Sequence, residues 1–106
     1  PKSVTAPIAM GIAEKIGGLP ALAAVFAVTT GIIGAALGKF VLDACRIGDW
    51  RARGFALGLA AHGIGTARAF QVNADAGAFA GLAFALHGLL AAILFPLGYW
   101  WLGQVR

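Results

Sequence analysis

Two long stretches without charged residues limit what this chain can fold into. Between Lys15 and Lys39 lie 23 uncharged residues, and between Asp75 and Arg106 lie 30. A helix needs about 20 mostly apolar residues to cross the hydrocarbon core of a bilayer. Each stretch is therefore predicted to contain one membrane-spanning helix.

The composition agrees with lipid as the solvent for much of the surface. Hydrophobic residues make up 60% of the chain, charged residues only 11%, and the mean hydropathy is +0.87. A soluble domain carries about a quarter charged residues, and one of this size buries only about two thirds of its unfolded surface. We therefore expect a membrane protein without a soluble domain.

Two shorter uncharged stretches are too short to cross a bilayer. The first contains 11 residues, between Lys2 and Glu14. Thr5 is suited to cap a helix there, and Pro7 falls in the first turn, where a missing N–H costs little. The glycines and proline that follow end this helix. Residues 6–16 are thus predicted to form a helix of about 16 Å, half a bilayer thick.

The second short stretch contains 14 uncharged residues, between Arg53 and Arg68, and ends in the sequence HGIGTA. Gly63 and Gly65 each lower helix stability by about 1 kcal/mol. We therefore predict that a helix unwinds from Gly63 to Gly65, and that Thr66 caps a new short helix after the break.

These elements predict an all-α fold: a polytopic membrane helix bundle with two discontinuous half-helix elements, forming half of a repeat-built transporter fold. A short echo at an offset of 61 residues, Thr5–Ala6 and Thr66–Ala67, predicts the same orientation for both half-helices. Because no Met opens the chain, we expect the C-terminal membrane region of a longer protein. Its predicted elements are a short helix at about 6–16, a span at about 20–47, a broken helix at about 52–72 and a span at about 76–102.

Small residues spaced four apart predict faces on which helices approach closely. The pairs are Ala27 and Gly31, Gly34 and Gly38, Gly54 and Gly58, and Gly77 and Gly81. Thr29 and Thr30 lie on the first of these helices, and their hydroxyl groups either bond to carbonyls one turn back or face a polar cavity.

Basic residues gather around one connection, at Lys39, Arg46, Arg51 and Arg53. Short cytoplasmic loops of membrane proteins collect Lys and Arg, so the connection from Lys39 to Arg53 is predicted to be cytoplasmic. The turn after residue 72 then lies outside, and the C-terminus returns to the cytoplasm. This pattern accounts for the pI near 10 without a basic face for nucleic acid, so no nucleic acid partner is expected.

The N-termini of the half-helices are the predicted binding site for an anion. The N–H groups of a first turn carry about half a positive charge, and broken helices of transporters bind carboxylates in this way. Lys2 precedes the first half-helix, and Arg68 is expected in the first turn of the second. Alternatively, Arg68 reaches lipid headgroups or pairs with Asp75 or Glu14.

Chemistry beyond binding has little support in the sequence. His62 is either a structural hydrogen-bonding group or a functional residue within the membrane. No second histidine or cysteine stands at metal-binding spacing, so no metal or other cofactor is expected. Ser3 is the only serine, and no Gly-x-Ser-x-Gly motif occurs, so an enzyme is not expected.

The chain resembles the C-terminal part of the LrgB/CidB family of bacterial membrane proteins in four segments: PKSVTAPIAM, IGGLPALAAVFAVTTGIIGAALG, GLAAHGIGTARAF and GAFAGLAFALHGLLAAILFPL. The resemblance covers nearly the whole chain. Its two motifs, PKSVTxPIA and AHGIGTA with a basic residue following, are specific in combination.

The resemblance implies two functions. Members of the family were first described as antiholin-like modulators of murein hydrolase activity and cell lysis that act with a holin-like LrgA/CidA partner. Relatives are linked to transport of small monocarboxylates: pyruvate in bacteria, glycolate and glycerate in the plastid envelope. Half-helices aimed at an anion favour transport. We therefore expect a multi-pass transporter of the bacterial inner membrane, with the lysis regulator as the alternative.

The family motifs fall on the residues that we expect to bind substrate: Lys2, Ser3, Thr5, His62, Gly63, Gly65, Thr66 and Arg68. Arg68 stands where we expect Lys in many relatives, a change that keeps the charge but alters the donor geometry. The expected partners are the lipid bilayer, a small carboxylate anion, a holin-like LrgA/CidA subunit and further copies of the chain.

Overall fold

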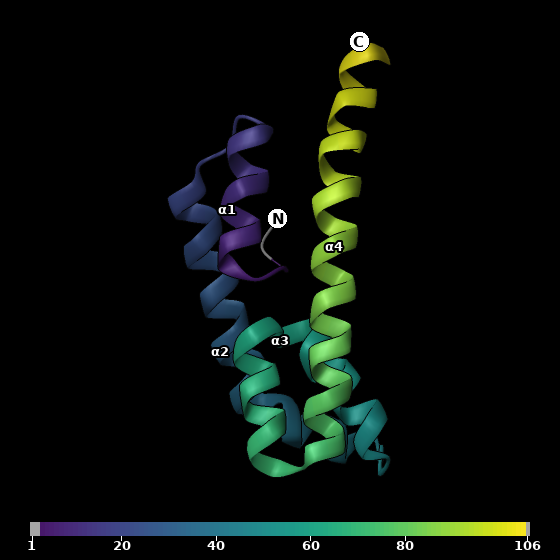
Figure 1. Ribbon diagram of the computed structural model, residues 1–106. Helices are drawn as coiled ribbons and strands as arrows, with labels where there is room; N and C mark the ends of the chain where they lie inside the picture. Colours follow the sequence, from purple (N-terminus) through teal and green to yellow (C-terminus); the bar gives the residue numbers. More distant parts are fainter. Residues whose placement is uncertain (1–2, 106) are drawn as a thin grey trace.

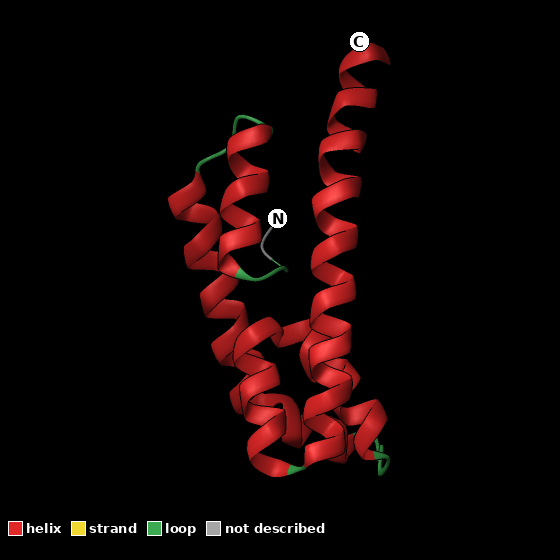
Figure 2. Ribbon diagram, viewed as in Figure 1, coloured by secondary structure: helices red, strands yellow, loops and turns green. Residues whose placement is uncertain are grey.

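The computed structural model describes residues 3–105, which form helices joined by short turns, with no strand among them (Figures 1 and 2). The all-α prediction is therefore confirmed for this part of the chain. The helices are α1 (Ala6–Lys15), α2 (Pro20–Ala44), α3 (Trp50–Val72) and α4 (Ala74–Val105).

Helix α1 ends as its glycines predict. Gly17 adopts a φ of 76°, and the N–H of Gly18 donates to the carbonyl oxygen of Ala13 at 2.7 Å. This is the Schellman arrangement, in which a left-handed residue lets the last carbonyls of a helix accept hydrogen bonds. Thr5 occupies the cap position of α1, but its side chain makes no capping hydrogen bond, so that detail of the prediction is wrong.

Helix α2 ends in the same arrangement without a glycine. Arg46 has a φ of 55°, and the N–H of Ile47 donates to the carbonyl oxygen of Leu42 at 3.1 Å. A side chain in the left-handed region costs about 1–2 kcal/mol because its Cβ crowds the following carbonyl. The connection after α2 is therefore held under local strain.

Replacing Arg46 by glycine should relieve this strain. We expect the free energy of unfolding to rise by about 1 kcal/mol. The reverse change, Gly17→Arg, should lower it by a similar amount, because a Cβ at Gly17 meets no other atom within 4 Å and only the backbone conformation is affected. Denaturant unfolding of both variants in detergent checks the prediction, and a loss of stability in Arg46→Gly would contradict it.

Arg53 links the connection between α2 and α3 to both of these helices. Its guanidinium forms an ion pair with Asp43 at 2.7 Å and donates to the carbonyl oxygen of Ile47 at 2.8 Å. It also lies 5.4 Å from the ring centre of Trp50.

Asp49 caps α3, because its carboxylate accepts a hydrogen bond from the backbone N–H of Arg51. This hydrogen bond lowers the pKa of the Asp49 carboxyl, so the cap stays charged in mild acid.

Helix α3 is a hairpin of two half-helices, residues 50–61 and 63–72, which meet at His62 (Figure 1). His62 has φ 51° and ψ −133°, close to the values of the first central residue of a type II′ turn. Trp50 and Val72, near the two ends of α3, line the same cavity. The chain therefore enters and leaves α3 at one end of the molecule.

Glycines allow the first half of α3 to lie directly on α4. A Cβ on Gly54 would overlap the backbone of Ala76, and one on Gly58 would overlap the backbone of Ala80. Gly54, Gly58, Ala76 and Ala80 are all buried. This contact confirms the close-packing face predicted at Gly54 and Gly58.

A second glycine face joins α2 to α3. A Cβ added to Gly34 would lie 2.8 Å from the Cβ of Ala61, and one added to Gly38 would lie 2.5 Å from Cδ2 of Leu57. The predicted face at Gly34 and Gly38 is thus also confirmed. The hairpin is clamped between α2 on one side and α4 on the other.

The hairpin changes the expected topology. The α1–α2 turn and the C-terminal end of α4 lie at one end of the molecule, whereas the α2–α3 connection and the α3–α4 turn lie at the other (Figure 1). The predicted sides of the membrane require the connection and the C-terminus to lie at the same end of the molecule, and the structure places them at opposite ends. The reason is that α3 returns to the end from which it started.

Helices α2 and α4 are long and apolar enough to cross a membrane. The mean hydropathy of an 18-residue window reaches 2.0 within Pro20–Ala44 and 2.1 within Ala74–Gln104. Only 17% and 22% of these apolar windows are buried inside the structure, so most of both helices presents apolar side chains outward. That exposure distinguishes them from the core helices of a soluble domain.

Candidate functional site

Two helix N-termini face each other near the middle of the molecule. Helix α1 starts there and runs toward the α1–α2 turn, whereas residues 63–72 start there and run toward the opposite end (Figure 1). The prediction that the two half-helices share an orientation is therefore wrong. The prediction that their N-termini form one site gains a physical basis, since both ends point into the same region.

A cavity of about 200 Å³ separates these two N-termini. Its lining contains Thr5 and Ala6 from α1, Ala27 and Val28 from α2, and His62, Gly63 and Ile64 from α3. A Cβ built on Gly63 would lie 3.9 Å from the hydroxyl oxygen of Thr5, with no other atom closer. The backbone at Gly63 is therefore open to a small molecule.

The cavity favours an anion over a cation. Each helix N-terminus contributes about half a positive charge through its free N–H groups, and no acidic side chain is part of the lining. Ala27, Val28 and Ile64 supply an apolar wall. The arrangement suits a molecule with one negative group and a short apolar remainder.

His62 marks the break itself. The break was predicted at Gly63 to Gly65, but the residue with non-helical angles is His62, and Gly63 opens the second half-helix. His62 is buried, with 4% of the residue exposed. His62 therefore forms the strained turn with its backbone and also lines the cavity.

Thr66 stabilises the break rather than capping a helix after it. Its hydroxyl group donates to the carbonyl oxygen of His62 at 2.9 Å. Gly65 is buried in the seam of the hairpin, where an added Cβ would meet the carbonyl oxygen of Leu57 and the Cβ of Ala61. Neither Gly65 nor Thr66 is part of the lining of the cavity between the two N-termini.

Arg68 lies further along the second half-helix than expected. It stands in the second turn, not the first, and its guanidinium donates to Gln71 at 3.2 Å. Among residues 3–105, neither Asp75 nor Glu14 forms an ion pair with it. Arg68 lines a groove of about 470 Å³ that also contains Gly63 and Ile64.

Of the predicted site residues, the structure brings Thr5, His62 and Gly63 together around one cavity. Ser3 lies just before Thr5, and Lys2 falls outside the described residues. Sequence reasoning did not identify the wall formed by Ala27 and Val28, although the small residues of α2 were a signal that another element approaches there.

The two threonines of α2 make the local hydrogen bonds that were one of the two interpretations. Thr29 donates to the carbonyl oxygen of Val25 at 2.8 Å, and Thr30 donates to that of Phe26 at 2.7 Å. Both hydroxyl groups therefore find their hydrogen-bond acceptors within α2, as is usual in membrane helices.

Comparison with known proteins identifies relatives of this chain. The chain is 40% identical over 96 residues to the uncharacterized protein YwbG of Bacillus subtilis, covering 91% of this chain and 43% of that protein. It is 33% identical over 100 residues to the holin-like protein CidB of Staphylococcus epidermidis, covering 92% and 42%. No solved structure matches. The chain spans about two fifths of the length of these relatives.

The family assignment follows from a match along almost the whole chain. The model of the LrgB-like family matches residues 1–101, which include the N-terminus of α1, the break at His62 and most of α4. Together with the two apolar helices, this match makes the chain part of a bacterial membrane protein. The chain belongs to the LrgB-like family.

Proposed function

We propose that the full-length protein carries small monocarboxylates, of the pyruvate, glycolate and glycerate class, across the bacterial inner membrane. The observation that carries the proposal is the cavity of about 200 Å³ between two opposed helix N-termini. Two such ends supply about one positive charge in total, which matches a monoanion. Since a water molecule takes about 30 Å³ in the liquid, the cavity has room for an acid of a few heavy atoms.

The carboxylate would accept hydrogen bonds from the free N–H groups of the two first turns, near Thr5 and Gly63. Its short apolar part would lie against Ala27 and Val28. The substrate leaves chemically unchanged, and the protein alternates access by moving other elements around the bound anion. Irregular backbone such as that at His62 is tolerated at membrane depth where it lines a cavity of this kind.

Filling the cavity tests this proposal. Gly63→Leu places a large side chain between Thr5 and His62, whereas Gly63→Ala adds one Cβ that finds only the Thr5 hydroxyl, at 3.9 Å. In liposomes holding the full-length protein, we expect saturable uptake of labelled pyruvate, glycolate or lactate to fall at least about tenfold in Gly63→Leu. Gly63→Ala should stay within about twofold.

Folded protein is matched between the variants by size-exclusion chromatography before uptake is measured. No uptake of any of the three acids above empty liposomes would reject the carrier. Equal uptake by wild type and Gly63→Leu would remove the site from this cavity while leaving transport intact.

A second candidate function is regulation of murein hydrolase activity and cell lysis together with a holin-like LrgA/CidA subunit. The name of the Staphylococcus relatives, holin-like protein CidB, favours it. This function requires packing faces rather than an anion site. It predicts that Gly63→Leu leaves lysis of a complemented deletion strain unchanged, whereas substitutions at Gly34 or Gly38 alter it.

A further inference from the structure

Three hollows follow one another along the second half of α3. The cavity at the break shares Gly63 and Ile64 with the groove of about 470 Å³. That groove shares Ala35 and Arg68 with a smaller cavity of about 70 Å³ near the connection. Shared lining residues make these hollows neighbours, in a row that offers a candidate route from the break to the end of the molecule that carries residues 45–49.

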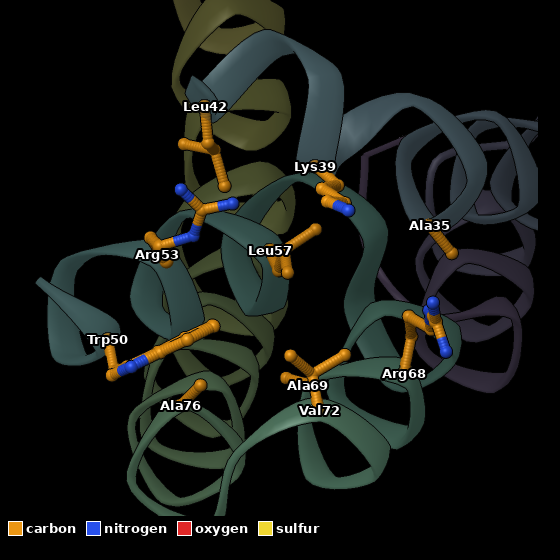
Figure 3. A pocket seen from close by; sticks show the side chains of 10 residues that line it. All are labelled: Ala35, Lys39, Leu42, Trp50, Arg53, Leu57, Arg68, Ala69, Val72 and Ala76. Atoms are coloured by element: carbon orange, nitrogen blue, oxygen red, sulfur yellow. The ribbon is translucent and has the colours of Figure 1, made fainter. Parts of the chain in front are cut away.

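The end of this route is basic. Lys39 from α2, Arg53 from the first half of α3 and Arg68 from the second half all line the smaller cavity (Figure 3). Arg53 is engaged by Asp43 at 2.7 Å and by the carbonyl oxygen of Ile47. Its charge is therefore already balanced, and its role is to hold the connection.

Lys39 and Arg68 differ from Arg53 in their charged partners. Within residues 3–105, no acidic side chain lies within ion-pair distance of either. Both are exposed, and they approach the same hollow from different helices (Figure 3). Two like charges on one hollow repel each other, so an anion between them lowers the electrostatic energy.

We infer that Lys39 and Arg68 form an entrance that collects carboxylate anions at the connection end and passes them along the second half of α3 to the break. This inference rests on the proposed carrier function and adds Lys39, together with a new role for Arg68. Charges at the mouth of a low-dielectric route raise the local concentration of the anion and its association rate, an effect that salt weakens.

The test uses the full-length protein in liposomes of zwitterionic lipid, with labelled pyruvate as the probe. Lys39→Gln and Arg68→Gln are compared with Arg51→Gln, which removes one charge from the same connection. Arg51 is 65% exposed and pairs with Asp49, and it lines none of the three hollows. Initial uptake rates are measured over a range of pyruvate concentrations at low and at high salt.

At low salt we expect each entrance variant to raise the KM for pyruvate by about fivefold, with the maximal rate within about twofold of wild type. The difference should shrink at high salt, and Arg51→Gln should match wild type. Normal kinetics in both Lys39→Gln and Arg68→Gln would overturn the entrance while the carrier stands.

Three other outcomes would overturn the inference. An equal rise in KM for Arg51→Gln would show a general effect of surface charge and overturn the inference. An effect that appears only when anionic lipid is added would assign the two cations to lipid headgroups instead. Absence of uptake by the wild-type protein would reject the carrier and the entrance together.

Discussion

Gly58→Ala is expected to lower the free energy of unfolding by about 3 kcal/mol, the upper end of the usual cost of overpacking. The added Cβ would overlap the carbonyl oxygen of Ala80, which belongs to the backbone of α4 and cannot rotate away. The two helices must therefore separate, and the contact that holds the hairpin against α4 is weakened. Denaturant unfolding of the full-length protein in detergent micelles measures the loss.

Gly98→Ala is the matched control for this variant. It makes the same chemical change in α4, at a position where the new Cβ meets nothing within 4 Å. Alanine is a better helix former than glycine by about 1 kcal/mol, so this control should be neutral or stabilising. Similar stabilities of Gly58→Ala and Gly98→Ala would contradict the close contact between α3 and α4.

His62→Gly is expected to be more stable than His62→Ala by about 1–3 kcal/mol. Both variants lose the imidazole, so the comparison isolates the backbone. A φ of 51° with a ψ of −133° suits glycine, because every other residue places a Cβ against the neighbouring backbone there. The order of stability is thus the reverse of that inside a helix.

Ala60 provides the reference for this reversal. It lies two residues earlier, in the helical first half of α3, and is exposed. Ala60→Gly should lower the free energy of unfolding by about 1 kcal/mol, the ordinary cost of glycine in a helix. If alanine proved better than glycine at position 62 as well, the hairpin turn would not be centred on His62.

Much of the architecture could be predicted because charge and length act over long stretches. The uncharged run from residue 16 to residue 38 gave α2 within a few residues, and the one after Asp75 gave α4. The turn glycines after α1 gave its end, since few other residues adopt a φ of 76°. The family assignment, carried by the PKSVT and AHGIGTA motifs, is confirmed by the match to residues 1–101.

The hairpin could not be predicted because a bent crossing and a reversal have the same local sequence. Both need an interrupted helix, and glycines at 63 and 65 supply the interruption in either case. The deciding feature is the positive φ of His62, a conformation that residues other than glycine adopt only in a few per cent of cases. What holds it there is distant in sequence: the backbone of α4 against Gly54 and Gly58, and α2 against Ala61.

The candidate site was predicted in its parts but not in its geometry. Thr5 and Gly63 were expected near helix N-termini, and both line the cavity. That the two N-termini oppose each other follows only from the reversal at His62. Because the break falls at His62, before the predicted Gly63 to Gly65, Arg68 lies in the second turn of the half-helix, where it lines the same hollow as Lys39 of another helix.

The hairpin also sets the order in which helix contacts can form during synthesis. Residues 50–61 leave the ribosome before α4, and Gly54 and Gly58 pack on the backbone of Ala76 and Ala80, which emerges later. The contact of α3 with α2 can therefore form first, whereas the contact with α4 completes the packing of the hairpin only after Ala80 has emerged.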